Sequence, residues 1–346
     1  MAKKGKNVRA TWWIVSVVVI VVVLIAAVFS VNRFSGRKAA TAPKEDHYVL
    51  KLADESGLCE APQQIAIEKG FFKKQGLKYK EVKLSQDTNG LDAITAGKVD
   101  ASNSLLASLV QPLANGADFK ITTGLHTGCI QILVGKHSKI KSVKDLKGKK
   151  IGVAEVAGSP ATFAKRVFAH AGLSVTTKHS DVEFATYDGA SLPLVLDKGQ
   201  VDAIAIGDPD TLIAKKQYGF KTLASSATTK PFAKEYCCVA YVSNKLAKEH
   251  PEIARKYTIA MQEAANWVAD HQKETVHLQT SKKYVAGAEA TNLAALKTYS
   301  WKASYHNGEA AFKQVAHSLQ DIGIVSKDVD VPALTKHSFL KVKGVQ

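Results

Sequence analysis

Four cysteines give this sequence its most versatile chemistry: Cys59, Cys129, Cys237 and Cys238. An even number of cysteines is compatible with disulfide bonds outside the cytoplasm. A four-thiolate metal site usually shows a C-x-x-C spacing, which the sequence lacks. Adjacent strand residues point to opposite faces, so Cys237 and Cys238 are not expected to serve one partner, although Cys129 can face one of them. We predict buried thiols and no metal site, with a disulfide and a soft-metal or thiol-reactive site as alternatives.

The sequence shows none of the common catalytic patterns. It contains no nucleophile elbow, no H-E-x-x-H pair, no glycine-rich phosphate loop and no paired carboxylates at helical spacing. We therefore predict that the protein is not an enzyme and has neither catalytic residues nor a cofactor.

Two predicted helix starts are suited to a small anion, because the first N–H groups of a helix are unpaired and its dipole is positive there. They comprise Cys59, Glu60, Ala61 and Pro62 after the first predicted strand, and Ser159 and Pro160 further along. Ser159 is expected to cap its helix and Pro160 to occupy the first helical position. We assign both starts to ligand binding. An ordinary cap without a ligand is the alternative for Ser159.

Other polar residues that follow predicted strands complete the expected ligand site: Asn103, Ser104, His126, Thr127 and Asp208. His126 and Thr127 can donate to an oxyanion. Acids beside an anion are unfavourable unless the ligand also carries a cationic group, so Glu60 and Asp208 favour a zwitterion or a heterocyclic base over bare nitrate or sulfate. The structural alternatives are loop hydrogen bonds at Asn103 and Ser104, a core or turn histidine, and an Asx turn or helix cap at Asp208.

A repeated unit indicates how these residues are positioned. The stretches "AGKVDASNSLLASL" from Ala96 and "KGQVDAIAIGDPDTL" from Lys198 both predict a helix end, a glycine turn, a strand and a polar loop. Between and around them, strands alternate with helices, which is typical of parallel sheets with helices on their faces. A helical stripe of Ile253, Tyr257 and Met261 is expected to pack back on the first lobe. The repeat therefore predicts two similar lobes.

Two long apolar segments are expected to join the lobes, "CIQILVGKHS" from Cys129 and "YCCVAYVSNK" from Tyr236. The predicted fold is α/β and two-lobed, with two doubly wound sheets joined by two crossover strands. Lobe I comprises 47–130 and 240–346, and lobe II is the insertion 131–239. Such an arrangement is a hinge around a cleft, and ligands of open α/β sheets bind at strand carboxyl ends.

The N-terminal segment predicts on which side of the membrane the protein lies. Residues 12–31 run without a charge, long enough to cross a bilayer as a helix. We expect a basic cytoplasmic stub over 1–11, a transmembrane anchor or uncleaved signal over 12–31, and a tether over 32–46, with secretion after signal cleavage as the alternative. The formal net charge of +16 comes mostly from scattered lysines, which indicates a solvated surface and no nucleic-acid partner.

Five motifs carry a family resemblance: "APQQIAIEKGFFKKQGL", "AITAGKVDAS", "KSVKDLKGKKIGV", "GSPATFAKRVFAHAGL" and "LVLDKGQVDAIAIGDP". In this order and spacing, over roughly 48–340, the chain resembles the periplasmic solute-binding proteins of ABC importers, in the branch for nitrate, sulfonate, taurine, bicarbonate and thiamine precursors. The resemblance implies a type II bilobed cleft. It also implies a monomeric receptor that delivers a small solute to permease and ATPase subunits, and it leaves the solute unnamed.

Two other functions share the resemblance. The thiamine-pyrimidine synthases, enzymes related to this branch, carry a longer cysteine run that "EYCCVAYV" does not match. A membrane-anchored sensor would report solute without transporting it. Relatives in single-membrane bacteria are commonly lipoproteins, whereas no cysteine precedes Cys59 here.

Overall fold

The computed structural model describes residues 47–54, 56–84 and 89–346. The predicted stub, anchor and tether over 1–46 lie outside these residues. Within the described part of the chain, no helix combines the length and apolar character needed to cross a membrane.

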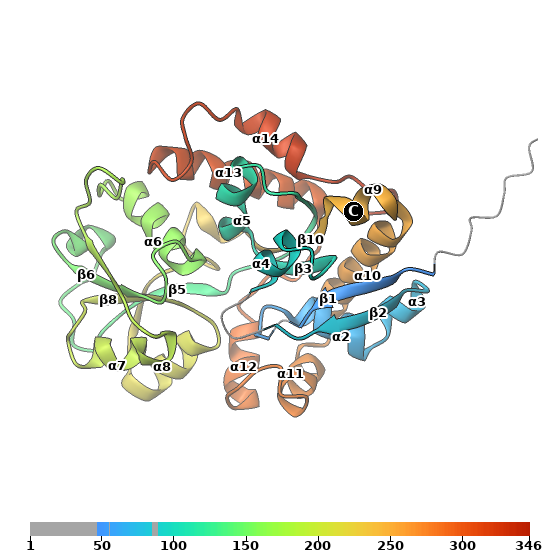
Figure 1. The fold of residues 1–346 in the computed structure, drawn as a ribbon. Coiled ribbons are helices and arrows are strands. Elements are labelled where there is room, and N and C mark those ends of the chain that lie inside the picture. Colours follow the sequence, from blue (N-terminus) through green and yellow to red (C-terminus); the bar gives the residue numbers. More distant parts are fainter. Residues whose placement is uncertain (1–46, 55, 85–88) are drawn as a thin grey trace, which may run out of the picture. The chain divides into compact units, whose positions relative to one another are not determined.

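The first sheet holds five strands in the order β2-β1-β3-β10-β4 (Figure 1). They are β1 (Val49–Ala53), β2 (Lys78–Val82), β3 (Ala101–Leu105), β4 (Phe119–Thr127) and β10 (Tyr236–Ser243). β1 pairs in parallel with β2 and β3, whereas β10 runs antiparallel to both β3 and β4. The strand that returns from the second sheet is therefore placed inside the first.

The second sheet repeats this plan in the order β7-β6-β8-β5-β9. Its strands are β5 (Ile130–Val134), β6 (Lys150–Val153), β7 (Glu183–Thr186), β8 (Ala203–Gly207) and β9 (Lys221–Ser225). β6 is parallel to β7 and β8, and β5 is antiparallel to β8 and β9. The predicted parallel sheets are therefore mixed sheets, each with one antiparallel strand inside it. In each sheet one strand, the one that the chain enters on arriving from the other sheet, runs antiparallel to its neighbours: β5 in the second sheet and β10 in the first.

The helices follow the strands along the chain. Those around the first sheet are α2 (Ala61–Glu68), α3 (Phe71–Lys74), α4 (Gly90–Thr95), α5 (Leu106–Ala114), α9 (Asn244–Glu249), α10 (Pro251–Asp270), α11 (Gln272–Ser281), α12 (Glu289–Leu296), α13 (Tyr305–Asp321) and α14 (Val331–Ser338). Those following strands of the second sheet are α6 (Ser159–His170), α7 (Leu192–Asp197) and α8 (Asp210–Tyr218), with 3₁₀ turns at Val143–Leu146, Gly189–Ser191 and Phe232–Lys234. Ile253, Tyr257 and Met261 of α10 are buried, as the predicted stripe requires.

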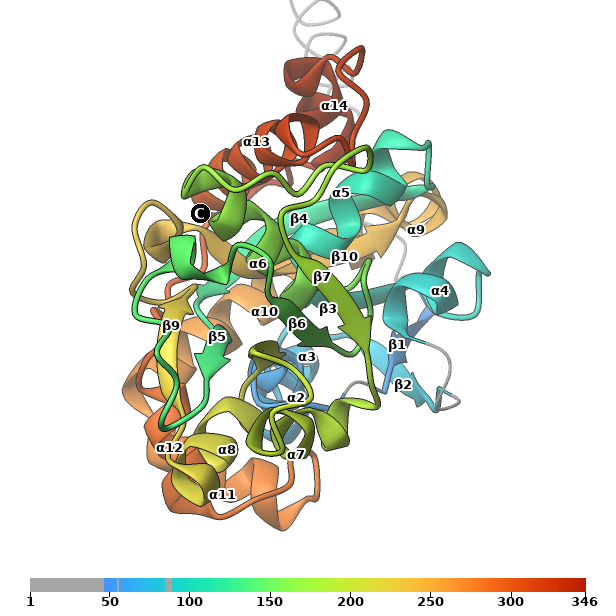
Figure 2. The same ribbon diagram turned by 90° about the vertical axis from the view of Figure 1, so that its left-hand side faces the viewer.

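The second sheet is covered on both faces, with α6 on one side and α7 and α8 on the other (Figures 1 and 2). Side chains of a strand alternate between faces. Accordingly, Ala203 and Ala205 of β8 lie in the core cluster that includes α6 residues, while Ile204 and Ile206 lie in the cluster with α7. This two-sided burial explains why β8 is almost wholly apolar.

The two repeated units contain the same pair of hydrogen bonds between an aspartate and a lysine of the neighbouring strand. Asp100 lies just before β3, and its Oδ2 accepts a hydrogen bond of 2.8 Å from the backbone N–H of Lys51 in β1. Asp202 lies just before β8, and its Oδ2 accepts one of 2.9 Å from the backbone N–H of Lys150 in β6. In both units the aspartate N–H also donates to the carbonyl of the same lysine, at 2.8 Å. Each aspartate therefore fixes the start of one strand against its parallel neighbour.

The chain passes from the first sheet to the second within two residues. Gly128 (φ 95°) and Cys129 (φ 91°) separate β4 from β5, and both have left-handed backbone conformations. It returns over 226–235, between β9 and β10. The backbone N–H of Ser226 donates to the carbonyl of Ile130 at 2.9 Å, so the two passages lie next to each other.

Candidate functional site

A cavity of about 250 Å³ lies between the first sheet and the start of α6. Its lining comprises Asn89, Leu91, Ser104, Leu105 and Ser108 from the first sheet and its helices, and Ala154, Glu155, Gly158, Ser159 and Pro160 from the loop after β6 and the start of α6. Parts of both repeated halves of the fold therefore face one space. Ser104, Ser159 and Pro160 are the predicted ligand residues that line it.

The start of α6 differs from the prediction by one residue. Gly158 is the N-cap, with φ −67° and ψ 161°, so Ser159 is the first helical residue and Pro160 occupies the second place. The expectation that Ser159 caps this helix is therefore wrong. Its side chain is 3 % exposed, and among the described residues its Oγ has no hydrogen-bond partner. A buried hydroxyl at a helix start, left without a partner, is suited to an incoming ligand.

The other predicted helix start is arranged differently. Glu60 is the N-cap of α2 but makes no side-chain capping bond. Instead its Oε2 accepts a hydrogen bond from Nδ2 of Asn103 in β3, and both side chains are buried. Ala61 and Pro62 are buried in the first turn of α2. None of these four is among the described residues that line the cavity at Ser159, and their part in binding stays a prediction.

His126, at the end of β4, lies in a polar network beside this pair. Its Nε2 is 3.1 Å from the carbonyl oxygen of Cys59 and its Nδ1 is 3.2 Å from that of Thr127. The ring is fully buried and stacks on Tyr299, with centroids 5.2 Å apart. Burial lowers the pKa of His126, but Cys238 and the two carbonyl oxygens outweigh it, so the pKa is raised overall. Thr127 Oγ1 accepts from the Ser300 N–H at 3.3 Å.

Asp208, in the loop after β8, joins the same network from the second sheet. Tyr299 donates its hydroxyl to Asp208 Oδ2 at 3.0 Å, and Gln131 Nε2 lies 3.5 Å from Oδ1. Burial raises the pKa of Asp208 to about 7, although these hydrogen bonds oppose the shift. The helix-cap alternative is not observed, because Pro209 is the N-cap of α8 and no side chain caps it.

The four cysteines are free thiols that converge at the passage between the sheets. Cys129 Sγ lies 2.7 Å from Cys237 Sγ, which confirms that Cys129 faces one of the vicinal pair. Cys238 also joins Cys129 and Cys237 in one group, so the expectation that the pair cannot serve a single partner is wrong. The pairing of β10 with β4 shifts register on either side of Cys238, and this irregularity breaks the strict alternation of side chains.

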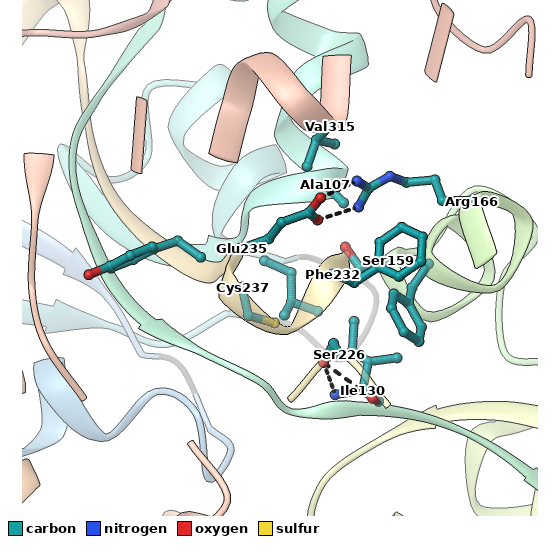
Figure 3. Close-up of a pocket in the computed structure, with 12 residues that line it drawn as sticks. Ala107, Ile130, Ser159, Arg166, Ser226, Phe232, Glu235, Cys237 and Val315 are labelled. Carbon is teal, nitrogen blue, oxygen red and sulfur yellow. Dashed lines mark hydrogen bonds and ion pairs between the residues drawn. The ribbon is translucent and has the colours of Figure 1, made fainter. Parts of the chain in front are cut away.

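A smaller cavity of about 30 Å³ connects Ser159 with Cys237 (Figure 3). Above it, Arg166 of α6 makes two hydrogen bonds of 2.8 Å to the carboxylate of Glu235, which precedes β10. Arg166 also donates to Ser318 Oγ of α13 at 3.4 Å. This buried pair ties the helix that starts at Ser159 to the returning chain.

Sequence reasoning missed several residues of these sites. Tyr299, which contacts both His126 and Asp208, lies in a loop with no motif around it. Asn89, Ser108 and Glu155 line the cavity at Ser159. Of these, only Glu155 carried a signal, because it stands between a predicted strand and the predicted start of α6.

Comparisons with known proteins decide the family. The sequence model described as NMT1/THI5 like matches residues 60–275. The chain belongs to the NMT1/THI5-like family. Among curated relatives of this family member, a protein of Bacillus subtilis (strain 168) named "Putative aliphatic sulfonates-binding protein" is 27% identical over 267 residues, covering 75% of this chain and 77% of that protein.

Solved structures show how this family member folds. The alkanesulfonate-binding protein SsuA from Xanthomonas axonopodis pv. citri, bound to MOPS, is 17% identical with a TM-score of 0.69, and the match covers 85% of this chain and 98% of that one. The periplasmic nitrate-binding protein NrtA from Synechocystis PCC 6803 is 14% identical with a TM-score of 0.69, covering 84% and 86%. The fold is thus the two-lobed type II periplasmic binding protein fold, here with two mixed five-stranded sheets.

Proposed function

We propose that this family member is the extracytoplasmic solute-binding receptor of an ABC import system. It captures a small anionic or zwitterionic solute of the sulfonate and nitrate class and delivers it to permease and ATPase subunits. The named relatives, an aliphatic sulfonates-binding and an alkanesulfonate-binding protein, support this class of solute.

One observation carries the proposal: Ser159, whose buried hydroxyl has no hydrogen-bond partner among the described residues, begins a twelve-residue helix and lines a cavity formed by both halves of the fold. The first N–H groups of α6 provide a positive dipole end, and Ser159 Oγ adds a donor. A sulfonate or nitrate presents several acceptor oxygens and matches such donors. Its size suits a cavity of about 250 Å³.

The opposite wall of the cavity suits the remainder of the solute. Asn89, Ser104 and Ser108 supply amide and hydroxyl groups from the first sheet side. Glu155 lines the same cavity near the start of α6, where the anion would bind, and it is exposed. A carboxylate next to an anion is favourable when the ligand also carries a cation. Glu155 therefore favours a zwitterion, such as an amino-sulfonate, over a bare anion.

Closure of the cleft completes the proposal. Residues 47–130 with 240–346 and residues 131–239 would move as lobes I and II about the two adjacent passages, and solute held by both would stabilise the closed form. The segment 12–31 would hold the receptor at the outer face of the membrane, near its permease.

Isothermal titration with taurine, an alkanesulfonate and nitrate tests the proposal. Ser159→Ala is expected to weaken binding of the preferred solute by about 10- to 100-fold, because a hydrogen bond to a charged group contributes roughly 1.5–3 kcal/mol. Ser191→Ala is the matched control. Ser191 also stands at a helix start after a strand of the second sheet, but makes no capping bond and is not among the described residues lining the cavity. Equal affinities for the wild-type protein and both variants would refute the proposal that the solute binds at the start of α6.

A further inference from the structure

The four thiols form one cluster of overlapping groups. Cys129, Cys237 and Cys238 have their sulfur atoms within 4.8 Å of one another, and Cys238 also lies within 4.8 Å of Cys59 Sγ and a ring nitrogen of His126. Cys238 therefore belongs to both groups and links them. Cys59 Sγ also donates to Glu60 Oε1 at 3.5 Å.

Three separate segments build this cluster. Cys59 comes from the loop before α2, and Cys129 from the passage between β4 and β5. Cys129 has a φ of 91°, a conformation that is uncommon outside glycine and that the surrounding structure must hold in place. Cys237 and Cys238 come from β10, whose register shift breaks the alternation of this pair. The backbone therefore brings the sulfur atoms together through local irregularities rather than regular strand geometry.

We propose that Cys59, Cys129, Cys237 and Cys238 bind one thiophilic d¹⁰ metal ion, Zn(II) or Cu(I), as thiolates. Each coordinating thiol loses its proton to solvent when the ion binds, with no change in oxidation state. Sulfur atoms bound to one zinc ion at about 2.3 Å stand at most about 4.6 Å apart. Those of Cys129, Cys237 and Cys238 already lie within 4.8 Å of one another, whereas Cys59, within 4.8 Å of Cys238, has to move toward the other two. Two buried thiols, Cys129 and Cys238, exclude hard cations that require oxygen ligands and water.

His126 is assigned an outer position. Both of its ring nitrogens face backbone carbonyl oxygens, at 3.1 Å and 3.2 Å, and one of these carbonyls belongs to Cys59. A histidine held in this way orients the loop that carries a ligand. Among the four cysteines, Cys237 lines the small cavity beside Ser159 (Figure 3).

The arrangement favours a metal over a simple disulfide. A Cys129–Cys237 bond would use two sulfur atoms and leave Cys59 and Cys238 adjacent and unexplained. A metal ion uses all four, and it joins the passage between the sheets to the loop before α2. Binding of the ion does not depend on the nature of the transported solute, so the proposed site and the proposed receptor function can fail separately.

The experiment uses the full chain, fully reduced and kept without oxygen, with Zn(II) alone and Cu(I) alone as probes. We expect one ion of at least one kind per chain after gel filtration. With it bound, mass spectrometry should show all four cysteines protected from alkylation. Cys238→Ser is expected to lower affinity at least about tenfold, because even the loss of an outer partner costs 10- to 100-fold. Ser226→Ala is the control. Its hydroxyl bonds to Ile130 next to Cys129 and contributes no sulfur.

Alkylation of the wild-type chain, compared with and without the ion, decides the question even if Cys238→Ser does not fold, because the half-buried Cys59 and Cys237 can react when no ion is bound. Unprotected alkylation of the four cysteines in the presence of both ions would overturn the site. The same conclusion would follow if the reduced chain bound neither ion and, once exposed to air, formed only a Cys129–Cys237 disulfide. Titration of taurine, run in parallel with and without the ion, reports separately on the solute site.

Discussion

Replacing the aspartates of the two repeated units is expected to destabilise the protein unequally. Asp100→Ala leaves the N–H of Lys51 without its carboxylate partner at a site where the aspartate side chain is only 8% exposed. A hydrogen bond to a charged group contributes roughly 1.5–3 kcal/mol when buried, so we expect a loss of about 2–3 kcal/mol. Asp202 makes the same bond with its side chain 36% exposed, and water can replace it. Asp202→Ala should therefore cost about 1 kcal/mol.

Urea unfolding, followed by both tryptophan fluorescence and far-ultraviolet circular dichroism, measures the two losses, and coincident transitions would validate a two-state treatment. Asp100→Asn keeps an acceptor oxygen and should recover part of the loss. Asp197→Ala, an exposed aspartate at the end of α7, should change stability by less than about 0.5 kcal/mol. Equal costs for Asp100→Ala and Asp202→Ala would refute the argument that burial sets the strength of this bond.

Two further changes test packing and charge. Gly308→Ala places a methyl group 2.7 Å from the backbone of β4, so it should destabilise the folded protein by about 1–3 kcal/mol. Gly135→Ala, which has open space around it, should leave the stability unchanged. Thermal unfolding of the two variants measures the difference. Because burial raises the pKa of Asp208 to about 7, the folded state binds its proton more tightly than the unfolded state. Stability should therefore fall as the pH rises from about 4 to about 7. Asp208→Asn should reduce that fall in urea midpoints, and an unchanged pH profile would contradict the assignment.

The sequence predicted the elements better than their directions. The two Val-Asp-Ala units and the buried stripe of α10 were readable because local chemistry and hydrophobic spacing determine them. The antiparallel entry of β5 and β10 was not readable, because strand direction depends on where the chain arrives from, which no local pattern encodes.

The candidate site was predictable only in part. Ser159 was found because serine and proline at a helix start have a strong local signature, but its place in the first turn was misjudged by one residue. Tyr299 was missed, since its contacts with His126 and Asp208 join positions far apart in the sequence. The convergence of the cysteines was missed because a register shift at Cys238 overrides the alternation assumed for a strand.

The position of β10 inside the first sheet sets the order in which the chain can be completed. All strands of the second sheet come from 130–225, one uninterrupted stretch, whereas β3 and β4 acquire the strand between them only when 236–243 arrive. As the polypeptide emerges during synthesis, the sheet encoded later is the first that can be finished. Until then the open edges of β3 and β4 are available to pair with other chains, so this interval is when the nascent protein most needs protection from aggregation.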